Sequence, residues 1–206
     1  MKKIAYYLLI LFFIASCRSY QPLSDLESGI VNGTVLDKTT NSGIPNATVY
    51  LLGNEGGGTW GGGGTASFLL DQTTSDAAGN FAFSFDYNNN YGYYCSAIAA
   101  QYFNYNEEIP VGDATFGANN VEVELQPIGY LSIHFINVLP SSPSDNFAIN
   151  GYITDNFYGD DIDTTVIYSV QGNTSNILHW AVGYSETLSD TIYCPSFDTT
   201  YYDLFY

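Results

Sequence analysis

The chain of 206 residues carries 21 acidic and only 4 basic side chains, so its formal net charge is −17 at pH 7. Four cations cannot build the basic surface that neutralises phosphate groups, so nucleic acid is excluded as a partner. Hydrophobic residues make up 46% of the chain and aromatic residues 17%, which is too apolar for an intrinsically disordered protein. The length fits one β-rich domain or two small ones.

The first seventeen residues have the pattern of an export signal. Two lysines precede the apolar run 4–14, and Ala15 and Ser16 lead into Cys17. At about 1.5 Å per helical residue, this apolar run is too short to cross a hydrocarbon core of roughly 30 Å. The segment therefore predicts a cleaved signal peptide over 1–16 and not a membrane span.

The end of this signal, Ile14-Ala15-Ser16-Cys17, resembles the lipobox of bacterial lipoproteins. The resemblance implies cleavage before Cys17 and acylation of its thiol and new amino group, for example with palmitate. The protein is then expected in the bacterial cell envelope, held in the outer membrane by its lipid, with 17–27 as a lipidated tether. A plain signal peptide cut nearby is the alternative.

From residue 28 onward the pattern is that of short β-strands separated by turn residues. Apolar residues alternate with other residues over 47–52, 81–86 and 121–126. Side chains on a strand project to opposite faces with a period of two, so each segment has one apolar face for a core. No helical period runs over a useful length in this part of the chain. We therefore predict an all-β fold built as a sandwich.

Three turn motifs occur in order within 28–127. The first is G-x-V-x-D from Gly33, and the others are Gly43-Ile44-Pro45-Asn46-Ala47 and Ser75-Asp76-Ala77-Ala78-Gly79-Asn80-Phe81. This order resembles the carboxypeptidase regulatory-like domain, a transthyretin/Ig-like β-sandwich of about seven strands. The resemblance implies a scaffold without peptidase activity. Gly43 and Gly79 suit positive φ angles, and Asp76 can accept hydrogen bonds from turn amides.

The remaining residues, 128–206, contain further β-like runs at 130–138, 146–154, 164–171, 177–184, 191–194 and 201–206. They resemble no family. We interpret them as a second small β-sandwich-like module that follows the first. In the alternative interpretation, the later strands extend the sheets of a single larger sandwich.

No catalytic set emerges, so the protein is predicted not to be an enzyme. His134 and His179 are the only histidines, and each lies in an expected strand without a nucleophile motif. We expect both to be half-buried structural residues, and a hydrolase using one of them is the alternative. Asp160, Asp161 and Asp163 offer oxygen ligands that Ca²⁺ favours. An acidic loop in solvent is the other interpretation, and no other cofactor is expected.

Two cysteines remain if Cys17 is acylated. Cys95 and Cys194 can form a disulfide in an oxidising envelope, which would join the two halves of the chain. Two separate buried thiols are the alternative.

Aromatic residues beside amide side chains suggest contact with sugars. The candidates are Trp60, in the glycine-rich loop 53–64, and Tyr91, Tyr93 and Tyr102 in a stretch rich in tyrosine and asparagine. Tyrosines on exposed strand faces are the alternative. The sequence thus predicts a non-enzymatic envelope lipoprotein that acts as a structural spacer or interaction module for a protein partner. A surface glycan-binding protein is the second hypothesis.

Overall fold

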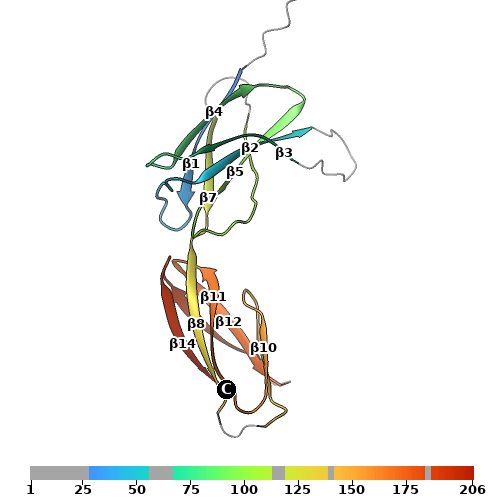
Figure 1. Cartoon of the computed structure of the whole chain (residues 1–206), viewed down its shortest axis with the longest axis vertical. Helices are drawn as coiled ribbons and strands as arrows, with labels where there is room; N and C mark the ends of the chain where they lie inside the picture. Colours follow the sequence, from blue (N-terminus) through green and yellow to red (C-terminus); the bar gives the residue numbers. More distant parts are fainter. Residues whose placement is uncertain (1–27, 56–66, 113–118, 139–141, 184–186) are drawn as a thin grey trace, which may run out of the picture.

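The computed structural model describes residues 28–55, 67–112, 119–138, 142–183 and 187–206, and every regular element in them is a β-strand. The predicted all-β fold is confirmed. The strands form two sets, β1–β7 and β8–β14, that share no sheet. Figure 1 shows one set below the other along the long axis of the molecule. Within the described residues, no helix has the length and apolar character needed to span a bilayer.

The first set is a sandwich of two sheets. One sheet has the order β4 (Asn80–Asp86), β1 (Ser28–Asp37) and β7 (Asn119–Leu125). The other has the order β3 (Phe68–Thr74), β2 (Thr48–Glu55), β5 (Tyr91–Ile98) and β6 (Ile109–Pro110). The expected apolar faces supply its core, because Val49, Leu51, Phe81, Phe83, Val121 and Val123 are all buried.

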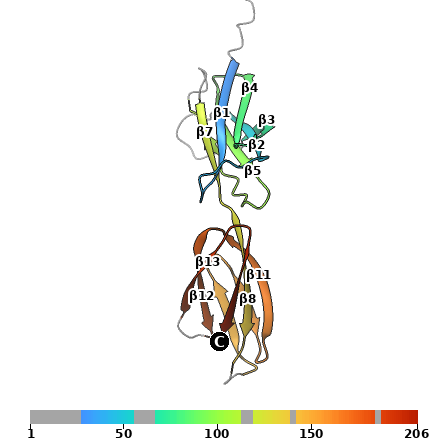
Figure 2. The same ribbon diagram turned by 90° about the vertical axis from the view of Figure 1, so that its left-hand side faces the viewer.

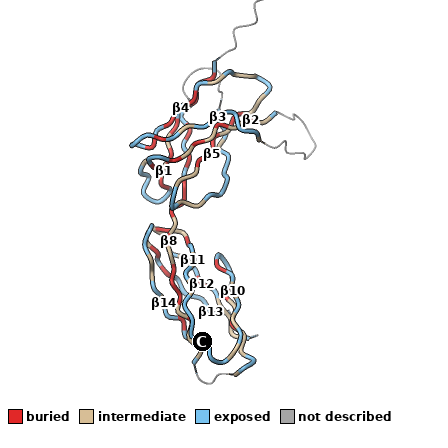
Figure 3. Tube along the Cα trace, in the orientation of Figure 1, coloured by how far each residue is buried: buried red, intermediate tan, exposed pale blue. Residues whose placement is uncertain are grey.

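The second set is also a sandwich, with a core of its own. One sheet has the order β11 (Asp163–Gln171), β8 (Ile128–Ile136) and β14 (Thr199–Phe205). The other has the order β10 (Asp155–Tyr158), β9 (Asn146–Asn150), β12 (Thr174–Val182) and β13 (Leu188–Cys194). Phe135, Phe147 and Ile149 are fully buried between these sheets. Figure 3 shows buried stretches in the strands of both sets.

The two sandwiches share one topology. When the strands are numbered from the first of each set, both three-stranded sheets have the order 4-1-7 and both four-stranded sheets have the order 3-2-5-6. The central strands β1 and β8 each pair antiparallel with the fourth strand of their set and parallel with the seventh. The C-terminal half, which the sequence linked to no family, therefore repeats the arrangement of the N-terminal half.

The turns of the first sandwich depend on two glycines for different reasons. Gly79 has a φ of +85°, which other residues rarely adopt. Gly43 does not share this feature, contrary to expectation. A Cβ at Gly43 would lie 1.9 Å from the backbone oxygen of Ala78, so glycine permits a close approach there. Asp76 accepts hydrogen bonds from the amides of Ala78 and Asn80, both at 2.8 Å, as predicted.

Candidate functional site

Hydrogen bonds and ring contacts from both sandwiches meet at the joint between them. β7 ends at Leu125 and β8 begins at Ile128, so Gln126 and Pro127 are the whole connection. Gln126 is 7% exposed, and its Nε2 donates a hydrogen bond to the carbonyl oxygen of Gly172 at 3.1 Å. The amide of Gly172 donates to the carbonyl oxygen of Pro127 at 2.8 Å. The connection is thus bonded to the β11–β12 turn of the second sandwich.

The loop after β5 pairs with the other side of the connection. The amide of Phe103 donates to the carbonyl oxygen of Gln126 at 2.9 Å. The amide of Ile128 donates to the carbonyl oxygen of Gln101, also at 2.9 Å. Backbone bonds from both sandwiches therefore hold the two connecting residues, and satisfy polar groups that burial would otherwise leave unpaired.

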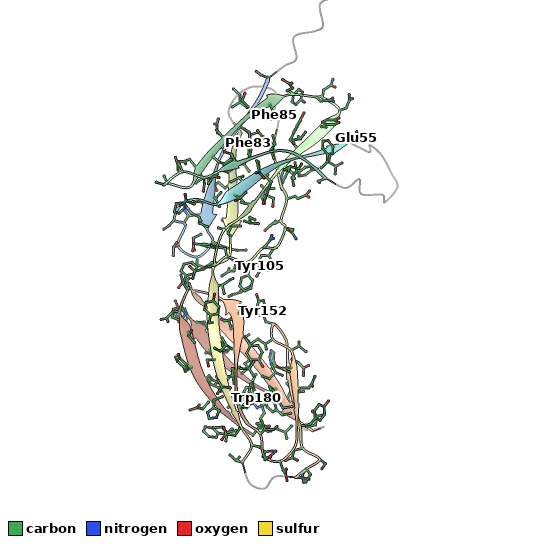
Figure 4. All side chains as sticks on the ribbon, viewed as in Figure 1. Glu55, Phe83, Phe85, Tyr105, Tyr152 and Trp180 are labelled. Carbon is green, nitrogen blue, oxygen red and sulfur yellow. The ribbon has the colours of Figure 1, made fainter. Side chains whose placement is uncertain are left out.

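Aromatic side chains meet across the joint. The hydroxyl oxygens of Tyr105 and Tyr152 lie 3.4 Å apart, and Figure 4 shows these two side chains approaching each other from the two sets. Phe103 stacks on Tyr105 with ring centroids 5.5 Å apart and meets Tyr152 edge-on at 6.0 Å. Burial and the Tyr105 hydroxyl raise the pKa of Tyr152, so the Tyr152 hydroxyl stays uncharged in the physiological range.

Asp37 organises another side of the joint. This carboxylate is 5% exposed and accepts hydrogen bonds from the amide and hydroxyl of Thr39, the amide of Thr40 and the hydroxyl of Tyr102. Burial alone would raise the pKa of Asp37, but these hydrogen bonds outweigh burial and lower the pKa below its usual value. Asn173 donates to the Thr39 hydroxyl at 3.0 Å. A chain of hydrogen bonds therefore runs from Asp37 into the second sandwich.

The four residues expected to contact glycans do not form a common surface. Trp60 lies outside the described residues. Tyr93 is 5% exposed in the first core, because the register of β5 turns it inward. Tyr91 is on the same side of β5 and meets Phe68 edge-on at 5.3 Å. Tyr102 is in the joint, bonded to Asp37. The structure therefore corrects the expectation that these tyrosines are exposed together.

The three aspartates proposed for Ca²⁺ do not converge either. Across the described part of the chain, no group of three or more His, Cys, Asp or Glu side chains is arranged to hold a metal ion. The Oδ1 atom of Asp163 instead lies 2.6 Å from Nε2 of His134. Asp160 and Asp161 lie in the bend before β11 and have no part in that contact.

His134 lies on the outer face of the β11–β8–β14 sheet between two carboxylates. Its Nδ1 atom is 3.3 Å from Oδ1 of Asp203, on the side opposite Asp163. The hydrogen bond to Asp163 is the main reason that the pKa of His134 is raised. The expectation of a half-buried histidine fits His134, whose side chain is 37% exposed. It is wrong for His179, which projects from β12 into solvent.

For the two remaining cysteines, the structure fits the alternative of two separate buried thiols and not the possible disulfide. Cys95 and Cys194 are both free and buried, and they belong to the separate cores of the two sandwiches. Burial raises the pKa of the Cys95 thiol to about 12, so it stays protonated. The predicted lipidation residue Cys17 lies outside the described residues.

Comparisons with known proteins identify no family. No family model and no curated protein matches the chain. The lipobox and the carboxypeptidase regulatory-like resemblance therefore stay predictions.

Several solved structures share limited similarity with the chain. A streptococcal ancillary pilin is 11% identical with a TM-score of 0.42, over 87% of this chain and 63% of that one. The minor pilin GBS52 of Streptococcus agalactiae is 12% identical with a TM-score of 0.42, over 86% and 94%. A DUF3823 protein of Bacteroides uniformis is 12% identical with a TM-score of 0.32, over 80% and 96%. The chain spans only a third of the Bacillus anthracis TIE protein, with 33% of that chain covered. These likenesses assign no function.

Proposed function

We propose that this chain is a non-enzymatic, lipid-anchored protein of the bacterial cell envelope whose two sandwiches form a stiff spacer. The joint supports the proposal. Its connection has two residues, and hydrogen bonds and ring contacts cross between the sandwiches at several points. The sandwiches stay in line when the view is turned by 90° (Figure 2). A spacer needs this resistance to bending, which a flexible linker would not supply.

The domain order fits an anchor at one end. We assign 1–16 to a signal peptide, 17–27 to the tether, 28–127 to the first domain and 128–206 to the second. The end of the chain lies at the bottom of the second sandwich, away from the first (Figure 1). From β7 to the end of β8, at roughly 3.3 Å per strand residue, the backbone extends about 60 Å. The second sandwich would thus hold its surface at a fixed distance from the tether, where a protein or glycan partner could bind it.

The charge distribution supports a body that stands away from the lipid surface. Residues 17–206 would keep two cations, Arg18 and Lys38, against all 21 acidic residues. Anionic lipid repels such a body within a Debye length of about 8 Å, so the acyl chains alone must hold it. We infer the outer membrane as the location of the anchor.

Labelling with radioactive palmitate tests the anchor. We expect the full chain expressed in bacteria to incorporate the label and to fractionate with membranes. The Cys17→Ala chain should do neither, whereas the matched Cys95→Ser chain should behave as the unmodified one. Label in the Cys17→Ala chain, or none in the unmodified chain, would reject lipid anchoring.

Distance measurements test the stiffness. Spin labels on Leu69 and Tyr158, exposed residues of different sandwiches, should give one narrow distance distribution. A variant with four Gly-Ser residues inserted between Gln126 and Pro127 should give a broad distribution. The hydrogen bond from Phe103 to Gln126 and the one from Gly172 to Pro127 would then be separated by a flexible segment. Equally broad distributions for both chains would contradict the spacer.

A further inference from the structure

We propose that the chain carries mechanical tension, with one parallel strand pair in each sandwich acting as a clamp loaded in shear. The proposal deepens the spacer function and rests on it, because tension requires an anchored end and a distal attachment. The clamps are β1 with β7 and β8 with β14. They exist in both sandwiches because the topology is repeated.

The path of the force follows from the strand order. A pull on the tether enters at the start of β1, the first strand of the first sandwich. It crosses to β7 through the pairing of Val31–Asp37 with Asn119–Leu125. It then passes through the two connecting residues into β8, and crosses to β14 through Tyr130–Ile136 and Thr199–Phe205. It leaves at the end of β14, near the end of the chain.

Parallel pairing decides how this load is shared. When force enters at the start of one strand and leaves at the end of its parallel partner, the strands are pulled past each other along their length. The evenly spaced ladder bonds then carry the load together and must break nearly at once. An antiparallel pair pulled apart from adjacent ends instead opens one position at a time. The same bonds thus resist a much larger force in the first geometry.

The cores protect both clamps from water. In the first clamp, Val31 and Val35 of β1 are fully buried, and Val121 and Val123 of β7 are at most 5% exposed. In the second clamp, Leu131 and Ile133 of β8 and Leu204 of β14 are at most 2% exposed. Water therefore reaches these ladders only from their outer faces, and a stretched bond on the core side is not readily replaced by a bond to solvent.

The joint transmits force without slack. Gln126 and Pro127 leave no length to extend, and the bonds to Gly172 hold them against the second sandwich. A load on β7 therefore reaches β8 while both sandwiches are intact. In two domains joined by a flexible linker, by contrast, the linker would extend before either domain carried load.

Single-molecule force spectroscopy in two pulling directions tests the proposal. The chain 18–206, which contains every strand, is pulled first by tags at its two ends. It is then pulled through Ser28→Cys and Asp86→Cys, which are paired neighbours on β1 and β4. We expect end-to-end pulling to give two rupture events, at forces about threefold or more above the opening of β1 from β4. At roughly 3.6 Å per extended residue, and after subtracting a folded span of about 30 Å for each sandwich, the events should release about 320 Å and about 250 Å of chain.

Equal forces in the two directions would overturn the proposal, because the same folded chain would then resist shear of the parallel ladders no better than opening of the β1–β4 ladder. A second comparison uses proline, which cannot donate a ladder bond. Thr34→Pro in β1 should lower the force of the longer release, because the Thr34 amide faces β7 while the neighbouring Val35 amide faces the other side and donates to Gly79. Asp71→Pro in β3, outside the force path, should not lower it. Equal losses in these two variants would count against the clamp. If Thr34→Pro does not fold, the comparison of the two pulling directions tests the proposal alone.

The outcomes separate this proposal from the spacer function. A low end-to-end force with a narrow distance distribution would reject load bearing and leave the spacer intact. High forces for 18–206, together with no palmitate incorporated by the full chain, would leave the clamps intact and reject the membrane anchor.

Discussion

Replacing Asp37 by alanine tests how the joint is stabilised. The carboxylate is buried and accepts four hydrogen bonds, at 2.8 and 2.6 Å from Thr39, 3.0 Å from Thr40 and 3.0 Å from Tyr102. Hydrogen bonds to charged groups contribute about 1.5–3 kcal/mol each, and the exposed Thr39 and Thr40 recover part of this from water. We therefore expect the free energy of unfolding of the first sandwich to fall by about 3 kcal/mol, or roughly 12–24 °C in Tm.

The contribution of Asp37 to stability depends on pH. Because the pKa of Asp37 is lower in the folded chain than its ordinary value of 3.8, its contribution is fully present above that value. It is lost as the pH falls through the folded pKa. The difference in stability between the unmodified chain and Asp37→Ala should thus be constant from pH 7 to 5. It should shrink in more acidic solution.

Urea unfolding followed by circular dichroism at pH 7, 5 and 2.5 measures both effects. Asp71→Ala is the matched control, because Asp71 is exposed on β3 and its replacement should change stability by less than about 0.5 kcal/mol. A loss for Asp37→Ala no larger than this control would refute the reasoning. So would a difference between the chains that is the same at all three pH values.

Three further outcomes follow from local geometry. The pKa of His134, followed by NMR, should lie above 6.5 and should fall in Asp163→Asn. The stabilisation from this contact should be present below pH 6.5 and lost as the pH rises through the folded pKa. An unchanged titration of His134 in the variant would contradict the contact. Gly43→Ala should lower Tm far more than Gly92→Ala. The added Cβ meets a backbone oxygen at 1.9 Å in the first variant and a tyrosine side chain at 3.3 Å in the second. Similar melting curves for the two variants would argue against the close approach at Gly43. The Cys95 thiol, with its pKa raised by burial to about 12, should react with a thiol reagent only after denaturation, and rapid labelling of the native chain would show that it is accessible.

Local patterns in the sequence predicted much of the first sandwich. Val49, Leu51, Phe81 and Phe83 are buried as their alternation required. Asp76 accepts the turn amides. The sequence did not reveal β3, since six of its seven residues are exposed and give no alternating pattern. The sequence did not predict β5 either, because its tyrosines suggested a polar surface. Tyr93 in fact faces the core.

The joint was beyond prediction because it depends on contacts between distant residues. Thr39 and Asn173 are 134 positions apart, and nothing in either local sequence indicates their pairing. The repeated topology was hidden in the same way, since strand order depends on which segments pair and not on their composition. In the local sequence at the joint, Gln126-Pro127 places a polar residue and a proline between two predicted strand segments. Such a pair marks a boundary without showing that the boundary is rigid.

The two-residue connection between β7 and β8 also fixes the rotation of the second sandwich about the long axis. Successive residues of an extended backbone point to opposite sides, so adding or deleting one residue here would turn the following strand by about half a revolution. The face bearing His134 would then look the opposite way. Loops elsewhere can change in length without this effect. The number of residues between β7 and β8 therefore sets the rotational orientation of the whole second sandwich relative to the first.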